Sequence, residues 1–487
     1  MSPIYVPGKI VFDSGNRPAA IAGVAPTLDY RFARERRRIE VVSLTDKLTY
    51  TGANGTYVGS DGLIKTTPVN LLTYSEEFDQ WTIGSNTTVT TNAVAAPDGT
   101  LTADRINSPA TGNTFISNAS VTVGTTYTAS VYAKAVTPGT NDTFTINVGG
   151  LSDNASPQLT ATAEWQRFTF TVTPSSISGG LFYINNEGDG FASDIYVWGA
   201  QLEEGSTATA YIPTTSTISG APRFDHDPAT GESLGLLIEE TRTNLQNYSE
   251  EFDNAVWVKT NGSISTNFET SPAGDQTVDK WIPASSNNYH YISSSRSVSA
   301  GTYTYSVYAK QSGYRYLLFN TPLGTTQGNS GPLVDLQDGV ITSYFGASTP
   351  TTVTNAGNGW WRIAITITAT GGQLKVDQNT FPTQTIATYN GDGTSGTLLW
   401  GAQLEEGSFP TSYIPTTSTT VTRAADSAII DGTSVLTGTY TMIEKPASCA
   451  VESGGNIELQ AGYTAERVMV FPAALSAQQI TDIRSAM

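Results

Sequence analysis

The chain repeats part of its own sequence in the same order, and this internal repeat constrains the fold more than any other feature. Tyr74 matches Tyr248 and Trp198 matches Trp400, with the separation between matches growing along the chain. The second copy therefore carries insertions between shared segments, and the chain holds two homologous modules. The matched segments are 70–79 with 244–253, 126–134 with 302–310, and 198–205 with 400–407.

Alternation of large and small residues dominates both modules. Residues 127–133, 168–172 and 361–367 place β-branched or aromatic side chains at every second position, as strands with one buried face do. Clusters of Gly, Asn, Asp and Pro, such as 138–142 and 390–393, separate these segments as turns. The pattern predicts an all-β fold with tandem antiparallel β-sandwich modules of the jelly-roll type.

The flanking segments differ from the modules and set the expected boundaries. Ser476 and Gln479 have capping-box spacing, which predicts a short helix at the C-terminal end. The predicted units are an extended N-terminal arm at 1–54, a first jelly roll at 55–217, a second jelly roll with a leading hairpin at 218–422, and a small C-terminal lectin-like β domain at 423–487.

Composition excludes several function classes. A single cysteine, Cys449, excludes an intrachain disulfide, and two histidines, His226 and His290, leave little material for multi-histidine metal sites. The formal net charge of −18 argues against nucleic acid as the main partner. The chain has no apolar run of about 18 residues and no basic-then-apolar leader, so we expect neither membrane insertion nor secretion by a signal peptide.

Adjacent glutamates recur in both modules and are the obvious carboxylates for glycosidase chemistry. Neighbouring residues of a strand point to opposite faces, so no doublet alone forms a catalytic pair. We interpret the doublets as rim charges or ligands of a structural cation. The four doublets are Glu76 with Glu77, Glu203 with Glu204, Glu250 with Glu251, and Glu405 with Glu406.

Aromatic residues supply the candidates for sugar binding, because an aromatic plane can stack on the apolar face of a sugar ring. Tryptophans at matching places in both copies, such as Trp198 and Trp400, are expected in the cores. Aromatic residues present only in the second module are the better ligand candidates. These are Tyr289, Tyr291, Tyr314, Tyr316 and Trp361.

Three phrases of this sequence resemble bacteriophage virion proteins, namely tail-fibre, tail-spike or capsid-fibre subunits built from jelly rolls like carbohydrate-binding modules. The likeness covers roughly residues 55 to 425. A shorter segment, 468–476, resembles the closing strand and helix of lectin-like laminin-G sandwiches. The phrases are Asn-Leu-Leu-Thr-Tyr-Ser-Glu-Glu-Phe-Asp at 70–79, the run from 224–228 into 235–244, and Trp-Gly-Ala-Gln-Leu-Glu-Glu-Gly at 400–407 with Tyr-Ile-Pro-Thr at 413–416.

The resemblance implies a non-enzymatic structural subunit of a virion, made in the host bacterial cytoplasm. Its N-terminus would attach to capsid, portal or tail protein, and its modules would adhere to host-surface glycan as a homotrimer. Calcium in the first module would be held by Asp194 and Glu77, whereas Gly396 occupies the aspartate position in the second. The dense basic stretch at residues 30–38 would dock onto another virion protein. Its arginines are Arg31, Arg34, Arg36, Arg37 and Arg38.

Two alternatives stay open at this point. A polysaccharide depolymerase would cleave with paired carboxylates, including Glu204 and Glu406. A capsid decoration or tail adaptor protein would bind other virion proteins and no sugar.

Overall fold

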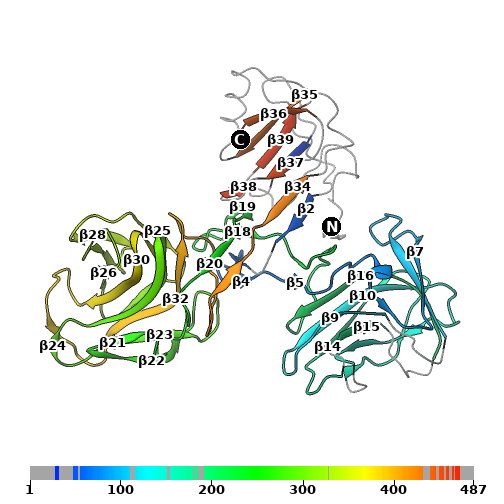
Figure 1. Cartoon of the computed structure of the whole chain (residues 1–487), viewed down its shortest axis with the longest axis horizontal. Coiled ribbons are helices and arrows are strands. Elements are labelled where there is room, and N and C mark those ends of the chain that lie inside the picture. Colours follow the sequence, from blue (N-terminus) through cyan, green and yellow to red (C-terminus); the bar gives the residue numbers. More distant parts are fainter. Residues whose placement is uncertain are drawn as a thin grey trace.

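The computed structural model places the chain in three β lobes (Figure 1). One lower lobe is the first module, the other is the second module, and the upper lobe combines strands from both ends of the chain. No described helix is long and apolar enough to span a membrane. The structure describes residues 28–31, 48–52, 55–109, 116–150, 154–178, 181–184, 191–326, 328–430, 439–445, 449–453, 457–459, 463–465 and 467–471.

The first module is a sandwich of a five-stranded and a four-stranded antiparallel sheet, in the orders β14-β10-β16-β8-β7 and β12-β15-β9-β6. Its core includes Phe78, Ile106, Val131 and Phe182, all fully buried. The strands are β6 (Thr82–Ile83), β7 (Thr88–Val94), β8 (Ala103–Ser108), β9 (Ile116–Ser120), β10 (Tyr127–Ala135), β12 (Ile146–Val148), β14 (Gln166–Val172), β15 (Leu181–Ile184) and β16 (Ser193–Glu204), with the small pair β11 (Thr143–Phe144) and β13 (Leu159–Thr160) and the 3-10 turn η1 (Phe78–Gln80).

The second module repeats this plan but joins its two layers into one ten-stranded sheet. Two strands of 22 and 21 residues, β25 (Tyr291–Ser312) and β30 (Trp361–Phe381), pair with each other along nearly their whole length. The other strands are β21 (Val258–Thr260), β22 (Gly262–Glu269), β23 (Val278–Pro283), β26 (Tyr316–Leu323), β27 (Gly331–Asp335), β28 (Val340–Phe345), β29 (Thr351–Asn355) and β32 (Gly396–Glu406), with the small pair β24 (Asn287–Asn288) and β31 (Tyr389–Asn390).

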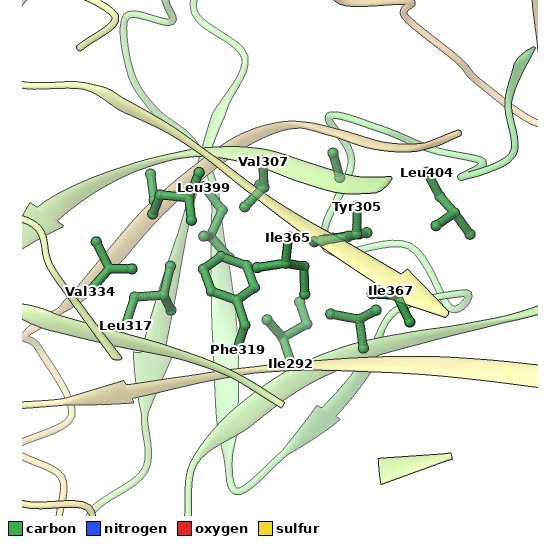
Figure 2. Close-up of a cluster of buried hydrophobic side chains, with 14 of the residues drawn as sticks. Ile292, Tyr305, Val307, Leu317, Phe319, Val334, Ile365, Ile367, Leu399 and Leu404 are labelled. Atoms are coloured by element: carbon green, nitrogen blue, oxygen red, sulfur yellow. The ribbon is translucent and has the colours of Figure 1, made fainter. Parts of the chain in front are cut away.

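Strand alternation explains how the second module buries its core. Ile292, Leu317, Phe319 and Ile365 point inward from β25, β26 and β30, and all four are fully buried (Figure 2). Their sequence neighbours on the same strands must point to the opposite face, because side chains alternate along a strand. The core therefore fixes which residues the sheet presents outward.

The upper lobe corrects the expected division into four consecutive units. Strand β1 (Leu28–Arg31) pairs with β39 (Arg467–Phe471), and β2 (Leu48–Thr51) pairs with β34 (Ser427–Ile430), so described segments of the predicted arm are strands of the C-terminal lobe. Strand pairing across more than 370 residues leaves no trace in local sequence patterns, which is why the arm was predicted as separate. The remaining strands are β35 (Thr439–Lys445), β36 (Cys449–Ser453), β37 (Ile457–Leu459) and β38 (Tyr463–Ala465).

Two hairpins fill the junction between the lobes. The hairpin of β3 (Thr56–Val58) and β4 (Ile64–Thr66) was assigned to the first module by sequence, but Ile64 packs in a cluster with Trp360 and Trp400 of the second. The hairpin of β18 (Phe224–His226) and β19 (Ser233–Ile238) pairs with β38 of the upper lobe. Short strand pairs close each module, β5 (Val69–Asn70) with β17 (Ser219–Gly220) and β20 (Arg242–Asn244) with β33 (Val421–Arg423).

A buried ion network lies at this junction. Arg223, whose side chain is fully buried, donates to Glu239 at 2.7 Å and to Asp426, and it also donates to the Thr56 carbonyl at 2.8 Å. The Tyr50 hydroxyl donates to Asp426 at 2.8 Å. Burial of the hydroxyl, and the negative charge of Asp426 beside it, raise the Tyr50 pKa above its ordinary value. The network thus connects β2, both hairpins and the segment before β34.

The predicted fold class is confirmed: the described chain is almost entirely antiparallel β structure with tandem sandwich modules. The predicted terminal helix at Ser476 lies outside the described residues.

Candidate functional site

Residues shared by the two modules act mainly as structural locks. The Asn244 side chain donates to the Ala402 and Ile414 carbonyls and accepts from the Gln246 and Leu404 amides, at 2.8–3.2 Å. Asn70 makes the same four hydrogen bonds at the matching place in the first module. Both asparagines are fully buried, so the repeated phrase at 70–79 and 244–253 holds the first and last segments of each sandwich together.

The repeated tyrosine near each module's end completes this lock. The Tyr413 hydroxyl contacts Ser249 Oγ at 2.6 Å and donates to Glu250 Oε1 at 2.8 Å. Tyr211 makes the same pair of contacts with Ser75 and Glu76, at 2.6 and 3.1 Å. Burial raises the pKa of both tyrosines well above the ordinary value, so they stay protonated donors.

The acidic doublets divide their roles. Glu405 is fully buried and accepts hydrogen bonds from the amide and hydroxyl of Thr411, and Glu203 does the same with Thr209. Glu204 and Glu406, their neighbours, are exposed. One carboxylate of each C-terminal doublet is therefore a buried acceptor for its own loop rather than a rim charge, whereas its neighbour lies at the surface.

The shared tryptophans Trp198 and Trp400 are core residues, as expected, each about 1% exposed. Their indole nitrogens donate to Thr102 and Thr277 at 3.0 and 2.9 Å. A buried indole whose N–H is satisfied within the protein has no surface to offer a sugar.

The residues predicted to hold calcium have other surroundings. Arg105 donates to both carboxylate oxygens of Asp194 at 2.7 Å, and this fork lowers the Asp194 pKa. Glu77 is exposed. Within the described part of the chain, no group of three or more His, Cys, Asp or Glu side chains could hold a metal ion. The calcium site stays a prediction, and a cation there would have to displace the Arg105 guanidinium.

Two of the five predicted ligand residues serve packing. The Trp361 indole donates to the Leu336 carbonyl at 2.9 Å, and its ring lies so close to Gly339 that a side chain there would collide with it. Tyr314 is only 6% exposed, and its hydroxyl accepts from the Asp392 amide at 3.1 Å.

The other three lie on or beside the outward face of the sheet formed by β25, β30 and β26. On this face Ser293, Asp377 and Asn320 stand in register on the three adjacent strands. Lys375 contacts Asp377 Oδ1 at 2.8 Å, and its ammonium lies 5.1 Å from the centroid of the Tyr291 ring. We call these five residues, Tyr291, Ser293, Asn320, Lys375 and Asp377, the polar row.

The polar row is buried to a degree that is unusual for such groups. Ser293 is fully buried and Asp377 is 6% exposed. Burial raises the Asp377 pKa, and the Lys375 ammonium beside it opposes that rise. Asn320 Oδ1 is buried and accepts no hydrogen bond from the residues that the structure describes. Buried acceptors without a protein partner are costly unless a ligand or water satisfies them.

Tyr316 and Tyr289 border the polar row differently. Tyr316 is half-buried and packs on an apolar cluster of Leu318, Leu333 and Phe381 on the same face, with Arg315 5.6 Å from its ring centroid. Tyr289 is 45% exposed and immediately precedes His290, which is buried at the end of the sheet. The structure thus gathers Tyr291 and Tyr316 on one face, with Tyr289 next to it in sequence.

The first module has different groups at this place. Across its corresponding sheet Tyr183 pairs in register with Asn147, whose side-chain oxygen accepts from the Gly150 amide at 2.7 Å. No charged side chain takes part in that pairing. Among the described residues, this combination of groups therefore occurs in the second module alone.

Reasoning from sequence missed the non-aromatic members of the polar row. The run 373–381 alternates Leu374 and Val376 with Lys375 and Asp377, which indicates a strand with a polar outer face. That signal marks the strand, but it does not reveal that β25 and β26 bring Ser293 and Asn320 beside Asp377.

The predicted docking arginines are mostly outside the described residues. Arg31 pairs with Arg467 in the β1–β39 ladder. Arg34, Arg36, Arg37 and Arg38 lie beyond the described part of the chain, so docking stays a prediction.

Comparison with known proteins assigns no family to the chain. No family model and no curated protein matches the chain. Among solved structures, tandem CBM22 modules of a Paenibacillus barcinonensis protein are 13% identical, with 70% of this chain and 98% of that chain covered and a TM-score of 0.25. Tandem CBM51 modules of a Streptococcus pneumoniae family 98 glycoside hydrolase are 8% identical, with 80% and 99% covered and a TM-score of 0.16.

A third structure, the extracellular domain of ANXUR2 from Arabidopsis thaliana, is 13% identical, with 71% of this chain and 99% of that chain covered and a TM-score of 0.18. TM-scores this low carry no argument. The functional argument therefore depends on the geometry of this chain.

Proposed function

We propose that the chain is a non-catalytic glycan-binding protein and that the polar row of the second module is its principal sugar-binding face. The observation that carries this proposal is the combination of one aromatic ring with buried polar groups on the outside of a rigid sheet. Asp377 and Asn320 offer acceptors, Lys375 offers donors, and Tyr291 offers an apolar surface. A sugar presents hydroxyls that both donate and accept, next to apolar C–H faces, which is the complement of this set.

The arrangement favours binding over turnover. Hydrolysis of a glycoside needs two carboxyl groups about 5–10 Å apart, one of them an acid. In the polar row Asp377 is the one carboxylate, and its partner is an ammonium. The chemistry supported here is recognition of hydroxyl groups, and we expect no glycosidase activity.

A glycan array probed with the full chain tests the proposal, followed by titration calorimetry with the strongest ligand. We expect Tyr291→Ala and Asp377→Asn each to weaken binding at least tenfold, because each removes one contact to the bound sugar. Phe268→Ala is the matched control: Phe268 is 46% exposed on β22, in the other layer of the same module, and its loss should leave affinity unchanged.

Two results would contradict the proposal. The first is a glycan array on which the full chain binds no sugar. The second is a signal that Tyr291→Ala and Asp377→Asn leave intact while both variants keep the wild-type circular dichroism and melting temperature.

The sequence resemblance supports a more specific setting for this activity. We propose that the chain is a subunit of a bacteriophage particle whose modules adhere to host-surface glycan, where weak single sites gain strength from multivalency. A particle reconstruction tests this by showing which protein residues 1–54 contact. Tight binding to capsid or tail protein together with a blank glycan array would select the adaptor function instead.

A further inference from the structure

A concave site lies at the end of the second module, away from the polar row. It is an open pocket of about 330 Å³ lined by Thr241, Arg242, Thr243, Leu245 and Glu406. Thr243 lies on β20 and Glu406 ends β32, so the walls of the pocket are formed in part by β-strands. The volume is at the small end of the range for ligand pockets, about 300–1,000 Å³, so it admits one or two sugar rings and no long chain.

Arg242 is held in place by three neighbours. Its Nη2 donates to Glu240 Oε1 at 2.5 Å, and its guanidinium carbon lies 4.9 Å from the Phe409 ring centroid. Gly407 has φ of +133°, and a Cβ there would lie 1.8 Å from Arg242 Nη1. Glycine at this position therefore makes the space that the guanidinium occupies.

The guanidinium retains donor capacity after these contacts. Arg242 Nε is buried and has no hydrogen-bond partner among the described residues, and the whole side chain is 11% exposed. A buried N–H without an acceptor is costly, and a shift of the side chain toward an acceptor on a ligand in the pocket would remove that cost. Glu406, exposed at the rim, supplies a carboxylate that can accept from a hydroxyl.

The internal repeat shows that this pocket is not part of the shared scaffold. Pro68 and Thr207 stand where the second module has Arg242 and Phe409. At Gly205, the counterpart of Gly407, a Cβ would meet nothing within 4 Å. The fold is built in the first module without these groups, so they are additions specific to the second.

We propose that this pocket binds the terminal, neutral sugar residue of a glycan, a proposal that rests on the glycan-binding function above. Arg242 and the pair of Glu240 and Glu406 give the site a net charge of −1, which disfavours an acidic sugar. A neutral ring can accept from Arg242, donate to Glu406 and lay a C–H face on Leu245. The pocket then selects chain ends, while the polar row binds the glycan elsewhere along its length.

The test is titration calorimetry of the full chain with a neutral oligosaccharide chosen from the array, and with the methyl glycoside of its terminal residue. Saturation-transfer NMR with the methyl glycoside serves as a second readout. The variants are Glu406→Gln and Arg242→Met in the pocket, Tyr291→Ala in the polar row, and Glu204→Gln as the control. Glu204 is the exposed counterpart of Glu406 in the first module, so the same substitution there should have no effect.

We expect two sites in the wild type, with Glu406→Gln and Arg242→Met abolishing the methyl-glycoside signal and Tyr291→Ala retaining it. Glu406→Gln keeps shape and removes one exposed charge, so it separates loss of binding from loss of fold. A single site sensitive only to Tyr291→Ala overturns the pocket and leaves the proposed function standing. Preferential binding of the methyl glycoside of glucuronic acid overturns the ligand class. Absence of any sugar binding overturns both.

Discussion

Replacing Arg223 by methionine tests the buried ion network most directly. The substitution removes the guanidinium that Asp426 and Glu239 share, while both carboxylates stay buried. Glu239 keeps a second cation, since Arg423 Nε lies 3.6 Å from Glu239 Oε2. Asp426 keeps two neutral donors, the Tyr50 hydroxyl at 2.8 Å and the Glu239 amide at 2.7 Å, together with the electrostatic attraction of Arg423.

The expected loss follows from these partners. Breaking a buried ion pair by removing one member costs about 3–5 kcal/mol. Because two donors remain on Asp426 and one cation on Glu239, we expect the lower end, about 3 kcal/mol. Removing both charges with Arg223→Met and Asp426→Leu should recover part of this loss, since no buried charge is then left uncompensated, although the Tyr50 hydroxyl and the Glu239 amide lose their acceptor.

Hydrogen exchange followed by mass spectrometry is the suitable assay, because a chain of three lobes does not unfold in one two-state step. Exchange should accelerate in β3, β18 and the segment before β34, the elements that the network joins. Arg105→Met is the control: Arg105 is 39% exposed in its pair with Asp194, so its loss should cost about 1 kcal/mol or less. The reasoning is refuted if Arg223→Met behaves like the control, or if the double variant is no more stable than the single.

Three further predictions concern the modules. Asn70→Ala and Asn244→Ala each remove four buried hydrogen bonds, so each should destabilise its own module by about 2–4 kcal/mol, measured by exchange in that module; a loss spread equally over both modules would contradict this. Burial raises the pKa of Asp104 and of Asp279 to about 6, so each contributes stability that is complete below about pH 4 and is lost as the pH rises through 6. Relative to the corresponding Asn variant, the wild type should gain about 2 kcal/mol per carboxyl between pH 7 and pH 4, measured by denaturant unfolding; a flat difference would count against the assignment. Calcium should leave the melting temperature unchanged, because Arg105 occupies both oxygens of Asp194; a rise on adding calcium that EDTA reverses would show that the ion displaces the guanidinium.

The sequence repeat predicted much of the architecture because a duplicated segment keeps the residues that its fold requires. Asn70 and Asn244, and Tyr211 and Tyr413, recur because each satisfies buried groups that every copy of the sandwich contains. The same logic placed Trp198 and Trp400 in the cores. Repetition identifies what the scaffold needs, and for that reason it points away from functional residues.

The candidate sites were only partly predictable. The aromatic residues unique to the second module include Tyr291 and Tyr316, whose ligand role stays a prediction, and also Trp361 and Tyr314, which pack inside the protein. Type and position in a strand do not distinguish a stacked ligand platform from a packed ring. That distinction depends on whether other parts of the folded protein cover the aromatic ring.

The sequence by itself determined the all-β class, the two homologous sandwiches and their shared locks, because alternation and repetition are local and countable. Only the tertiary structure decided that β1 and β2 join the C-terminal lobe, that the first hairpin packs on the second module, and that Ser293, Asp377 and Asn320 meet in one row. These outcomes depend on pairing between strands far apart in the chain. Such pairing is selected by the total burial and hydrogen bonding of the folded molecule, which no short stretch of sequence encodes.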